Sequence, residues 1–240
     1  MEYLTDFQKN VIDKTNEQGI QNKKKHMDII NKYNLTENEL NKLDTLFDNM
    51  IIAVNFPNRV ITKLAKDTHY RNQFETKTSK GTYDPTKRRT WEKYLFYNQY
   101  DDKPDFDRPK YGNLQIGNDK SDRRIQNTYG ECHLVLKKSV MDRCTFTYGD
   151  SALNYDDKYV HLFKYAYEIY QYITKTAFIS LVKTGHANLS IRYIEIQIHG
   201  EIKLDRDILK IVAPTNYKNT DKEQDLQQLA KQHNISLEWQ

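Results

Sequence analysis

Apolar residues recur every three or four positions over 36–52, which is the spacing of one face of an α-helix: Leu40, Leu43, Leu46, Phe47, Met50 and Ile51. Thr36 followed by Glu39 adds a capping box, in which two side chains pair with the unpaired backbone N–H groups at the start of a helix. The sequence therefore predicts a helix over 36–52. A weaker pattern in the first thirty residues, broken near Gly19, predicts one or two earlier helices.

The same spacing returns in three later segments. Residues 60–67 predict a short helix. After Asp156 a continuous apolar stripe predicts a long helix: Val160, Phe163, Tyr167, Tyr170, Ile173 and Ala177. Thr220 with Glu223 forms a second capping box, which predicts a helix that continues through Leu229.

Runs rich in β-branched and aromatic residues predict strands between these helices. The run over 51–56 ends at Pro57, which has no N–H group for a strand ladder. The other predicted strands cover 133–136, 144–148, 188–204 and 235–239. Residues 68–131 are polar and broken by glycine and proline, and they predict a long loop. Embedded aromatic residues would anchor it over a ligand, with an ordinary surface loop as the alternative. The order of elements predicts an α+β protein, with a helical N-terminal lobe over 1–52 and a core over 53–240.

The composition is that of a folded chain with a polar surface. Only 38% of the 240 residues are hydrophobic and the mean hydropathy is -0.89, but 18 Tyr and 9 Phe supply bulk that a disordered chain lacks. No apolar run approaches the roughly 18 residues of a membrane span, and the N-terminus lacks the zones of a signal peptide. We therefore expect no membrane association, and a cytoplasmic protein or one delivered by a leaderless secretion route.

The net charge of +4 is the small difference between 37 basic and 33 acidic residues. It is too weak for a nucleic-acid footprint by itself, yet it tolerates an anionic ligand. The two cysteines, Cys132 and Cys144, fit reduced thiols better than a disulfide framework.

The polar row on the strand 188–204 is the most informative candidate site. Side chains alternate along a strand, so three isoleucines share one face, while Tyr193, Glu195, Gln197 and His199 share the other. A solvated strand face is the simpler interpretation. Against it, a strand-averse glutamate stands beside a glutamine and a histidine, three groups that can orient a ligand. Glu195 is therefore the leading catalytic candidate, with Gln197 beside it.

Hydroxyl and arginine clusters supply further candidates for ligand binding. Thr76, Thr78 and Ser79 precede Gly81 and could bind a phosphate or a ribose, or fix the rotamer of a carboxylate, although such stretches are often plain turns. Arg59 and Arg108 each lie next to a proline-stiffened turn and could bind phosphate, with a surface salt bridge as the alternative. Tyr111 could stack on a ring.

Other chemistries do not fit the spacing of their residues. Walker, G-x-G-x-x-G, G-x-S-x-G and H-E-x-x-H motifs are missing from the sequence. Cys132, His133 and Cys144 could supply three zinc ligands, but without finger spacing or an indicated fourth ligand. A cysteine nucleophile paired with His133 or His199 is a similarly weak alternative, and no metal is expected.

Taken together, the polar islands resemble a bacterial family that carries a domain-of-unknown-function label. The resemblance spans roughly residues 53–212 and rests on NFPNR (55–59), HYRNQFETKTSKG (69–81), RRTWEKYLF (88–96), RPKYGNLQI (108–116), YGECHLVLKKSVMDRCTFTYGDS (129–151) and YIEIQIHGEIKL (193–204).

The order of three islands is also similar, more distantly, to the bacterial toxin-type ADP-ribosyltransferases of the Arg–Ser–Glu class. This resemblance implies an ADP-ribosyltransferase-like split β-sandwich core that uses NAD as substrate, with a catalytic Glu195. Arg59 would bind the diphosphate, Thr78 or Ser79 would position the glutamate or the ribose, and Tyr111 would stack on nicotinamide. The expected activity is transfer of ADP-ribose to a protein or nucleic-acid acceptor, or NAD hydrolysis, and an immunity protein would be a fitting partner. A non-catalytic module that binds a nucleotide or phosphate is the rival interpretation.

Overall fold

The computed structural model describes residues 3–31, 33–34, 36–78, 83–115, 128–152, 160–171, 175–184 and 194–240. Its α-helices are α1 (Asp6–Asn31), α2 (Glu37–Asp48), α3 (Ile61–Leu64), α4 (Gln73–Thr76), α5 (Pro85–Leu95), α7 (Lys175–Thr184), α8 (Leu204–Asp207) and α9 (Asp221–Gln232). The 3-10 helices are η1 (Asn58–Val60), η2 (Asp105–Asp107), η3 (Lys138–Arg143), η5 (Phe163–Gln171) and η6 (Thr215–Tyr217). The strands are β1 (Ile51–Phe56), β2 (Lys110–Gln115), β3 (Cys132–Leu136), β4 (Cys144–Tyr148), β5 (Ile194–Ile198), β6 (Ile208–Ala213) and β7 (Ser236–Trp239).

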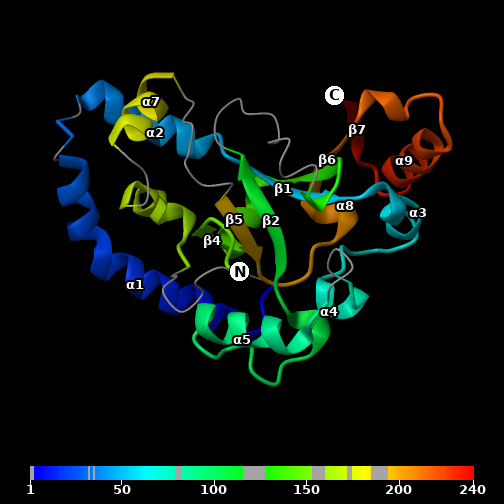
Figure 1. Ribbon diagram of the computed structural model, residues 1–240, viewed down its shortest axis with the longest axis horizontal. Coiled ribbons are helices and arrows are strands. Elements are labelled where there is room, and N and C mark those ends of the chain that lie inside the picture. The colour runs from blue at the N-terminus through cyan, green and yellow to red at the C-terminus, as the bar shows by residue number, and fades with distance from the viewer. Residues whose placement is uncertain are drawn as a thin grey trace.

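The strands form one seven-stranded sheet in the order β4-β5-β2-β1-β3-β6-β7. All neighbours are antiparallel except β6 and β7, which run parallel. The sheet lies at the centre of the molecule, with α1, α2 and α7 on one side of the view and α3 and α9 on the other (Figure 1). The expected mixture of helices and strands is confirmed. The finer expectation of a split β-sandwich is not confirmed, because the described strands belong to this single sheet.

One face of the sheet is apolar and forms the main core. The alternating side chains of β1 place Ile52, Val54 and Phe56 on this face, and the isoleucines of β5 join the same cluster. Helices α3 and α9 contribute further leucines to this cluster, among them Leu64 and Leu229. Each large side chain fully buried in this way stabilises the fold by about 1.5–3 kcal/mol.

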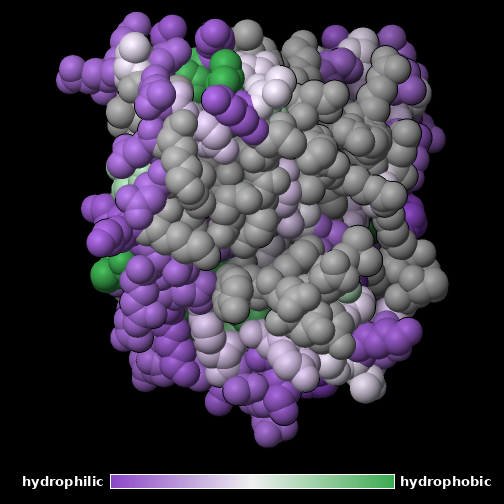
Figure 2. Space-filling view, turned by 60° about the vertical axis from the view of Figure 1, so that its left-hand side comes forward, coloured by the Kyte–Doolittle hydropathy of each residue, from purple (hydrophilic) through white to green (hydrophobic). Residues whose placement is uncertain are grey.

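The N-terminal helices pack on the rest of the chain. Val11 of α1 is buried in a second cluster with Leu95, Phe96, Tyr100 and Val160. The proposed boundary at residue 52 falls inside β1, which begins at Ile51. In Figure 2 the described surface is mostly hydrophilic, and its hydrophobic residues show as small separate patches. Across the described residues, every helix is too short or too polar to cross a membrane.

Several local predictions are confirmed. Helix α2 has the predicted capping box, because the Thr36 N–H donates to Glu39 Oε2 at 2.9 Å and the Glu39 N–H donates to Thr36 Oγ1 at 3.3 Å. Strand β1 has the predicted bounds, and β3, β4 and β7 differ from prediction by one residue or less. Strand β5 covers part of 188–204, of which 188–193 lie outside the described residues.

Other predictions are wrong. The stripe after Asp156 is divided between η5 and α7, and Tyr165 inside η5 has non-helical angles (φ -118, ψ 33). The Thr220 capping box does not form, because the Thr220 hydroxyl donates to Tyr217 O at 2.6 Å while Glu223 Oε2 accepts from the Asn219 N–H at 2.6 Å. Residues 68–131 are not one long loop, since they include α5 and the internal strand β2.

Candidate functional site

The second face of the sheet carries a row of buried polar side chains from five neighbouring strands. They are Thr145 and Thr147 of β4, Glu195 and Gln197 of β5, Asn113 of β2, Asn55 of β1 and His133 of β3. The register puts Glu195 opposite Asn113 on one side and Thr147 on the other. The polar row predicted for β5 therefore exists, but it is buried rather than solvated. We call this row the polar face.

Glu195 lies at the centre of the polar face with only 6% of its surface exposed. Gln197 Nε2 donates to Glu195 Oε1 at 3.0 Å, and the Ser151 backbone N–H lies 3.5 Å from Oε2. Burial raises the pKa of Glu195 to about 7, against the lowering effect of its hydrogen bonds from Ser151 and Gln197. A carboxyl group with this pKa changes charge near neutral pH, as catalytic carboxyl groups often do.

Asn113 presents a fixed acceptor beside Glu195. Its Nδ2 group donates to Asn55 Oδ1 at 2.7 Å and to Ala53 O at 3.2 Å, and Asn55 Nδ2 in turn donates to Gly130 O at 2.9 Å. These bonds determine which end of the Asn113 amide carries the oxygen. Asn113 Oδ1 is buried and has no hydrogen-bond partner among the described residues. Buried acceptors are normally paired with protein or ordered water, so this oxygen calls for a donor from a water molecule or a ligand.

His133 extends the polar face toward β3. Burial lowers its pKa to about 4, with a further contribution from Lys210, so the ring is neutral at pH 7. The thiols of Cys132 and Cys144 lie in the apolar cluster on the opposite face of the sheet. The three side chains do not converge, so the zinc alternative and the pairing of either thiol with His133 are wrong.

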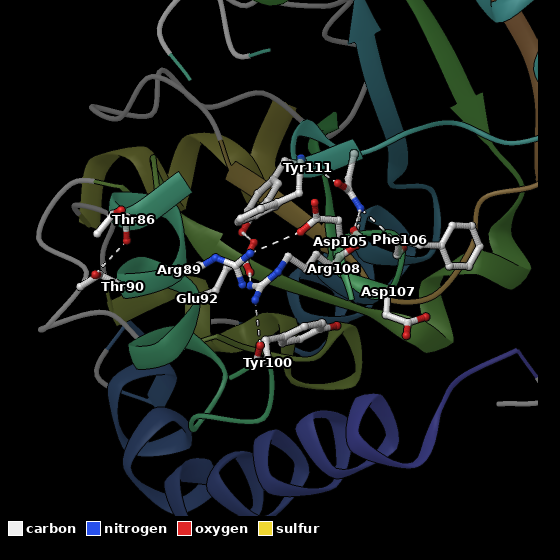
Figure 3. A network of polar contacts seen from close by, with 12 residues as sticks. Thr86, Arg89, Thr90, Glu92, Tyr100, Asp105, Phe106, Asp107, Arg108 and Tyr111 are labelled. Carbon is white, nitrogen blue, oxygen red and sulfur yellow. Dashed lines mark hydrogen bonds and ion pairs between the residues drawn. The ribbon is translucent and has the colours of Figure 1, made fainter. Parts of the chain in front are cut away.

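A buried ion pair lies beside the polar face and involves two of the predicted binding residues (Figure 3). Arg108 donates to Glu92 Oε2 and, at 3.1 Å, to Tyr100 O, while the Tyr111 hydroxyl donates to Glu92 Oε1 at 3.1 Å. Burial raises the pKa of Glu92 to about 7, and Arg108 opposes that rise. Asn72 holds the backbone at Arg108, since its Nδ2 donates to Arg108 O at 3.2 Å. The two terminal nitrogens of the Arg108 guanidinium are therefore committed to contacts within the protein, while its buried Nε has no hydrogen-bond partner among the described residues.

The structure brings together some of the predicted site residues. Gln197 and Tyr111 are direct partners on neighbouring strands, and Glu195 lies on the same face two residues from Gln197. Tyr111 is half-buried and connects the polar face to the Glu92–Arg108 pair.

The remaining predicted residues lie elsewhere. Arg59 is exposed in η1, beyond the end of β1. Thr76 is the exposed last residue of α4, and its Oγ1 donates to Asn72 O at 3.0 Å. Thr78 is exposed just after this helix, and its Oγ1 donates to Thr76 Oγ1 at 3.2 Å. Ser79 lies outside the described residues. Among the described contacts, none joins Arg59, Thr76 or Thr78 to Glu195.

Sequence reasoning missed Asn55, Asn113 and Glu92. The segment Lys110–Gln115 has leucine as its one strongly apolar residue, so it shows no alternation from which to predict a strand. Asn55 could have been predicted, because a polar residue inside the apolar run 51–56 is unusual and, when buried, needs a hydrogen-bond partner.

With this geometry in view, comparison with known proteins identifies the family. The profile of a family described as "Protein of unknown function (DUF3626)" matches residues 53–165 and 165–240. The chain belongs to this family, which confirms the expected domain of unknown function. Comparison with curated proteins finds no match.

Proposed function

We propose that this protein cleaves the bond between nicotinamide and ribose in NAD, with Glu195 as the catalytic carboxylate. The ADP-ribose would pass to a macromolecular acceptor, which makes the protein an ADP-ribosyltransferase, or to water, which makes it an NAD glycohydrolase. An ADP-ribosyltransferase-like core is part of the same proposal.

One observation carries the proposal: two buried acceptors, the Glu195 carboxyl group and Asn113 Oδ1, lie side by side on neighbouring strands. Side chains opposite each other in an antiparallel pair have Cβ atoms about 5 Å apart, so one small group can contact both. A ligand at this position must bring hydrogen-bond donors, and the neighbouring hydroxyls of a ribose do so. An ionised phosphate brings only acceptors and a charge that the carboxylate repels, which disfavours a phosphate-binding module at this face.

The carboxylate suits the chemistry of the bond. When the C1′–N bond breaks, its electron pair leaves with nicotinamide, which departs neutral, and positive charge develops on the ribose. A buried carboxylate near the ribose stabilises this charge more strongly than it would in water. An acceptor group or a water molecule then attacks C1′ and loses its proton. Gln197 holds the carboxylate in place through its bond to Oε1.

The other roles rest on the resemblance in residue order. Tyr111, beside Gln197, would stack on the nicotinamide ring. Arg59 would bind the diphosphate, a role better suited to it than to Arg108, because the Arg108 guanidinium already pairs with Glu92. Thr76, Thr78 and Ser79 would bind a phosphate or ribose of NAD, since Thr76 and Thr78 make no described contact with Glu195.

The test is incubation with NAD labelled in its adenylate half, with nicotinamide release and transfer of label measured together. Release with transfer indicates a transferase, and release alone indicates a glycohydrolase. Glu195→Gln is nearly isosteric and should lower the rate about 100-fold or more.

The matched control is Glu238→Gln, which removes the same charge from β7, at the far edge of the sheet. It should leave the rate within about twofold. Unchanged turnover in a folded Glu195→Gln protein would remove Glu195 from the mechanism. A wild-type protein that neither releases nicotinamide nor gains thermal stability with millimolar NAD would refute the proposed function as a whole.

A further inference from the structure

A continuous chain of buried hydrogen bonds runs from Tyr100, which follows α5, through side chains of β4 and β5 to Glu195. The Tyr100 hydroxyl lies 2.6 Å from His199 Nδ1, and His199 Nε2 lies 3.1 Å from Thr145 Oγ1. Thr145 Oγ1 is 3.0 Å from Gln197 Oε1, and Gln197 Nε2 is 3.0 Å from Glu195 Oε1. All five residues are buried. Nothing in the catalytic proposal uses Tyr100, His199 or Thr145.

The protons in this chain can be placed from its geometry. A threonine hydroxyl has one proton, and Thr145 is in contact with two groups, His199 Nε2 and Gln197 Oε1. If Thr145 donated to His199, its oxygen would face Gln197 Oε1 with no proton between them. Thr145 must therefore donate to Gln197, and His199 must donate to Thr145 from Nε2.

The two ends of the chain agree with this direction. With its proton on Nε2, a neutral His199 accepts at Nδ1, so the Tyr100 hydroxyl donates to it. Burial lowers the pKa of His199 to about 3, with Arg143 and Lys110 adding to the effect, which keeps the ring neutral. At the other end, Gln197 Nε2 also donates to Thr147 Oγ1 at 3.0 Å, and the Thr147 hydroxyl donates onward to Gly149 O at 3.2 Å.

Tyr100 is itself held firmly. Burial raises its pKa well above the usual range, while a hydrogen bond from Gln8 of α1 acts in the opposite direction. Gln8 cannot reverse its amide, because its Oε1 accepts from the Thr5 N–H at 2.9 Å and its Nε2 donates to Asp107 O at 2.7 Å. Phe96 packs edge-on against the His199 ring, with centroids 5.3 Å apart.

We infer that His199, fixed by Tyr100 as the tautomer protonated at Nε2, is a positioning residue that acts through Thr145 to orient the Gln197 amide toward Glu195. Every donor in the chain points toward the carboxylate. The Gln197 amide is anchored independently at its other end, because Nε2 donates to both Glu195 Oε1 and Thr147 Oγ1, and the Thr147 proton is already donated to Gly149 O. The link to turnover rests on the proposed function, whereas the tautomer and the amide orientation do not.

The experiment compares the full-length wild-type protein with its Thr145→Val and Thr145→Ser variants. Valine matches the shape of threonine but lacks the hydroxyl, and serine keeps it. With NAD as substrate, Thr145→Val should lower kcat by about 10- to 100-fold with little change in KM, the scale of a small misplacement of a catalytic group. Thr145→Ser should recover most of the loss, which a purely structural role of the methyl group would not produce.

The spectroscopic arm does not depend on activity. In protein labelled with 15N-histidine, the His199 signal, assigned by its loss in His199→Gln, should show a neutral ring protonated at Nε2. Tyr100→Phe removes the donor to Nδ1 and should shift that signal. It also serves as the second variant if Thr145→Val does not fold.

The outcomes separate the two proposals. A His199 ring protonated at Nδ1 or doubly protonated at pH 7 would overturn the inference, and so would a folded Thr145→Val protein with wild-type kcat. If the wild type does not act on NAD, the proposed function fails. In that case the inferred hydrogen-bond chain is still tested by the His199 tautomer. It is also tested by the side-chain NH₂ signals of Gln197, which should be shielded from exchange in the wild type and Thr145→Ser but not in Thr145→Val.

Discussion

Replacing Glu92 with glutamine should destabilise the fold by about 3–5 kcal/mol, the usual cost of breaking a buried ion pair from one side. The side chains of Arg108 and Glu92 are only 2% and 1% exposed, so the arginine left behind could not turn to water. Its second donor contact, to Tyr100 O, is a neutral carbonyl and cannot balance the charge.

This free energy converts to a clear thermal shift. Unfolding entropies near 60 °C are about 2.1 cal/mol/K per residue, so a chain of 240 residues has about 0.5 kcal/mol/K. A loss of about 3–5 kcal/mol then lowers Tm by about 6–10 °C. Chemical unfolding at pH 8 is the better assay, since both partners are charged there. The raised pKa of Glu92, about 7, works against the loss, because burial disfavours its ionised form, so the lower end of this range is expected.

Two controls make the result specific. Glu238→Gln breaks the exposed pair between Lys210 and Glu238 and should cost less than about 1 kcal/mol. Replacing both members of the buried pair by apolar residues, Glu92→Leu with Arg108→Met, should recover much of the loss, because no charge is then stranded.

A Glu92→Gln protein as stable as Glu238→Gln would refute this reasoning. It would mean that Arg108 does not need Glu92, and the guanidinium would then be available for an anionic ligand, as the sequence alone suggested.

Three further predictions follow from single sites. Because the folded-state pKa of Glu195 is raised from 4.5 to about 7, its neutral form contributes stability that is fully present below pH 4.5 and lost as the pH rises to about 7. Titration of unfolding free energy should show the wild type losing about 3 kcal/mol relative to Glu195→Gln across that window, and parallel curves would contradict the shift. Gly130→Ala should cost about 2 kcal/mol or more in chemical unfolding, since Gly130 has φ +127 and an added Cβ would overlap the backbone of Phe56; a neutral change would disprove that conformation. Cys132 and Cys144 are buried thiols with raised pKa values and should react with a thiol reagent only after denaturant is added, so fast labelling of the native protein would place them at the surface.

The sequence by itself determined the elements that depend on neighbours along the chain. Helix α2 could be predicted because its apolar spacing and its capping box involve residues three or four positions apart. Strand β1 could be predicted because a β-rich run meets a proline that ends it. The alternation of Ile194 to Ile198 also fixed which residues of β5 share a face, since the pleat of a strand has a period of two.

Only the tertiary structure decided what those faces meet. Strand β2 is internal because β1 and β5 pair with it on either side, and its own sequence pattern gave no sign of that. Asn113 and Asn55 are hydrogen-bonded although they lie 58 positions apart in the sequence. Arg108 forms an ion pair with Glu92, which lies on α5, 16 positions earlier. Whether the polar row of β5 faced water or the interior depended on elements packed over it, such as Tyr100 against His199. Contacts of this kind join residues that the sequence separates, so local spacing cannot encode them, and the fold alone gives Glu195 its buried setting.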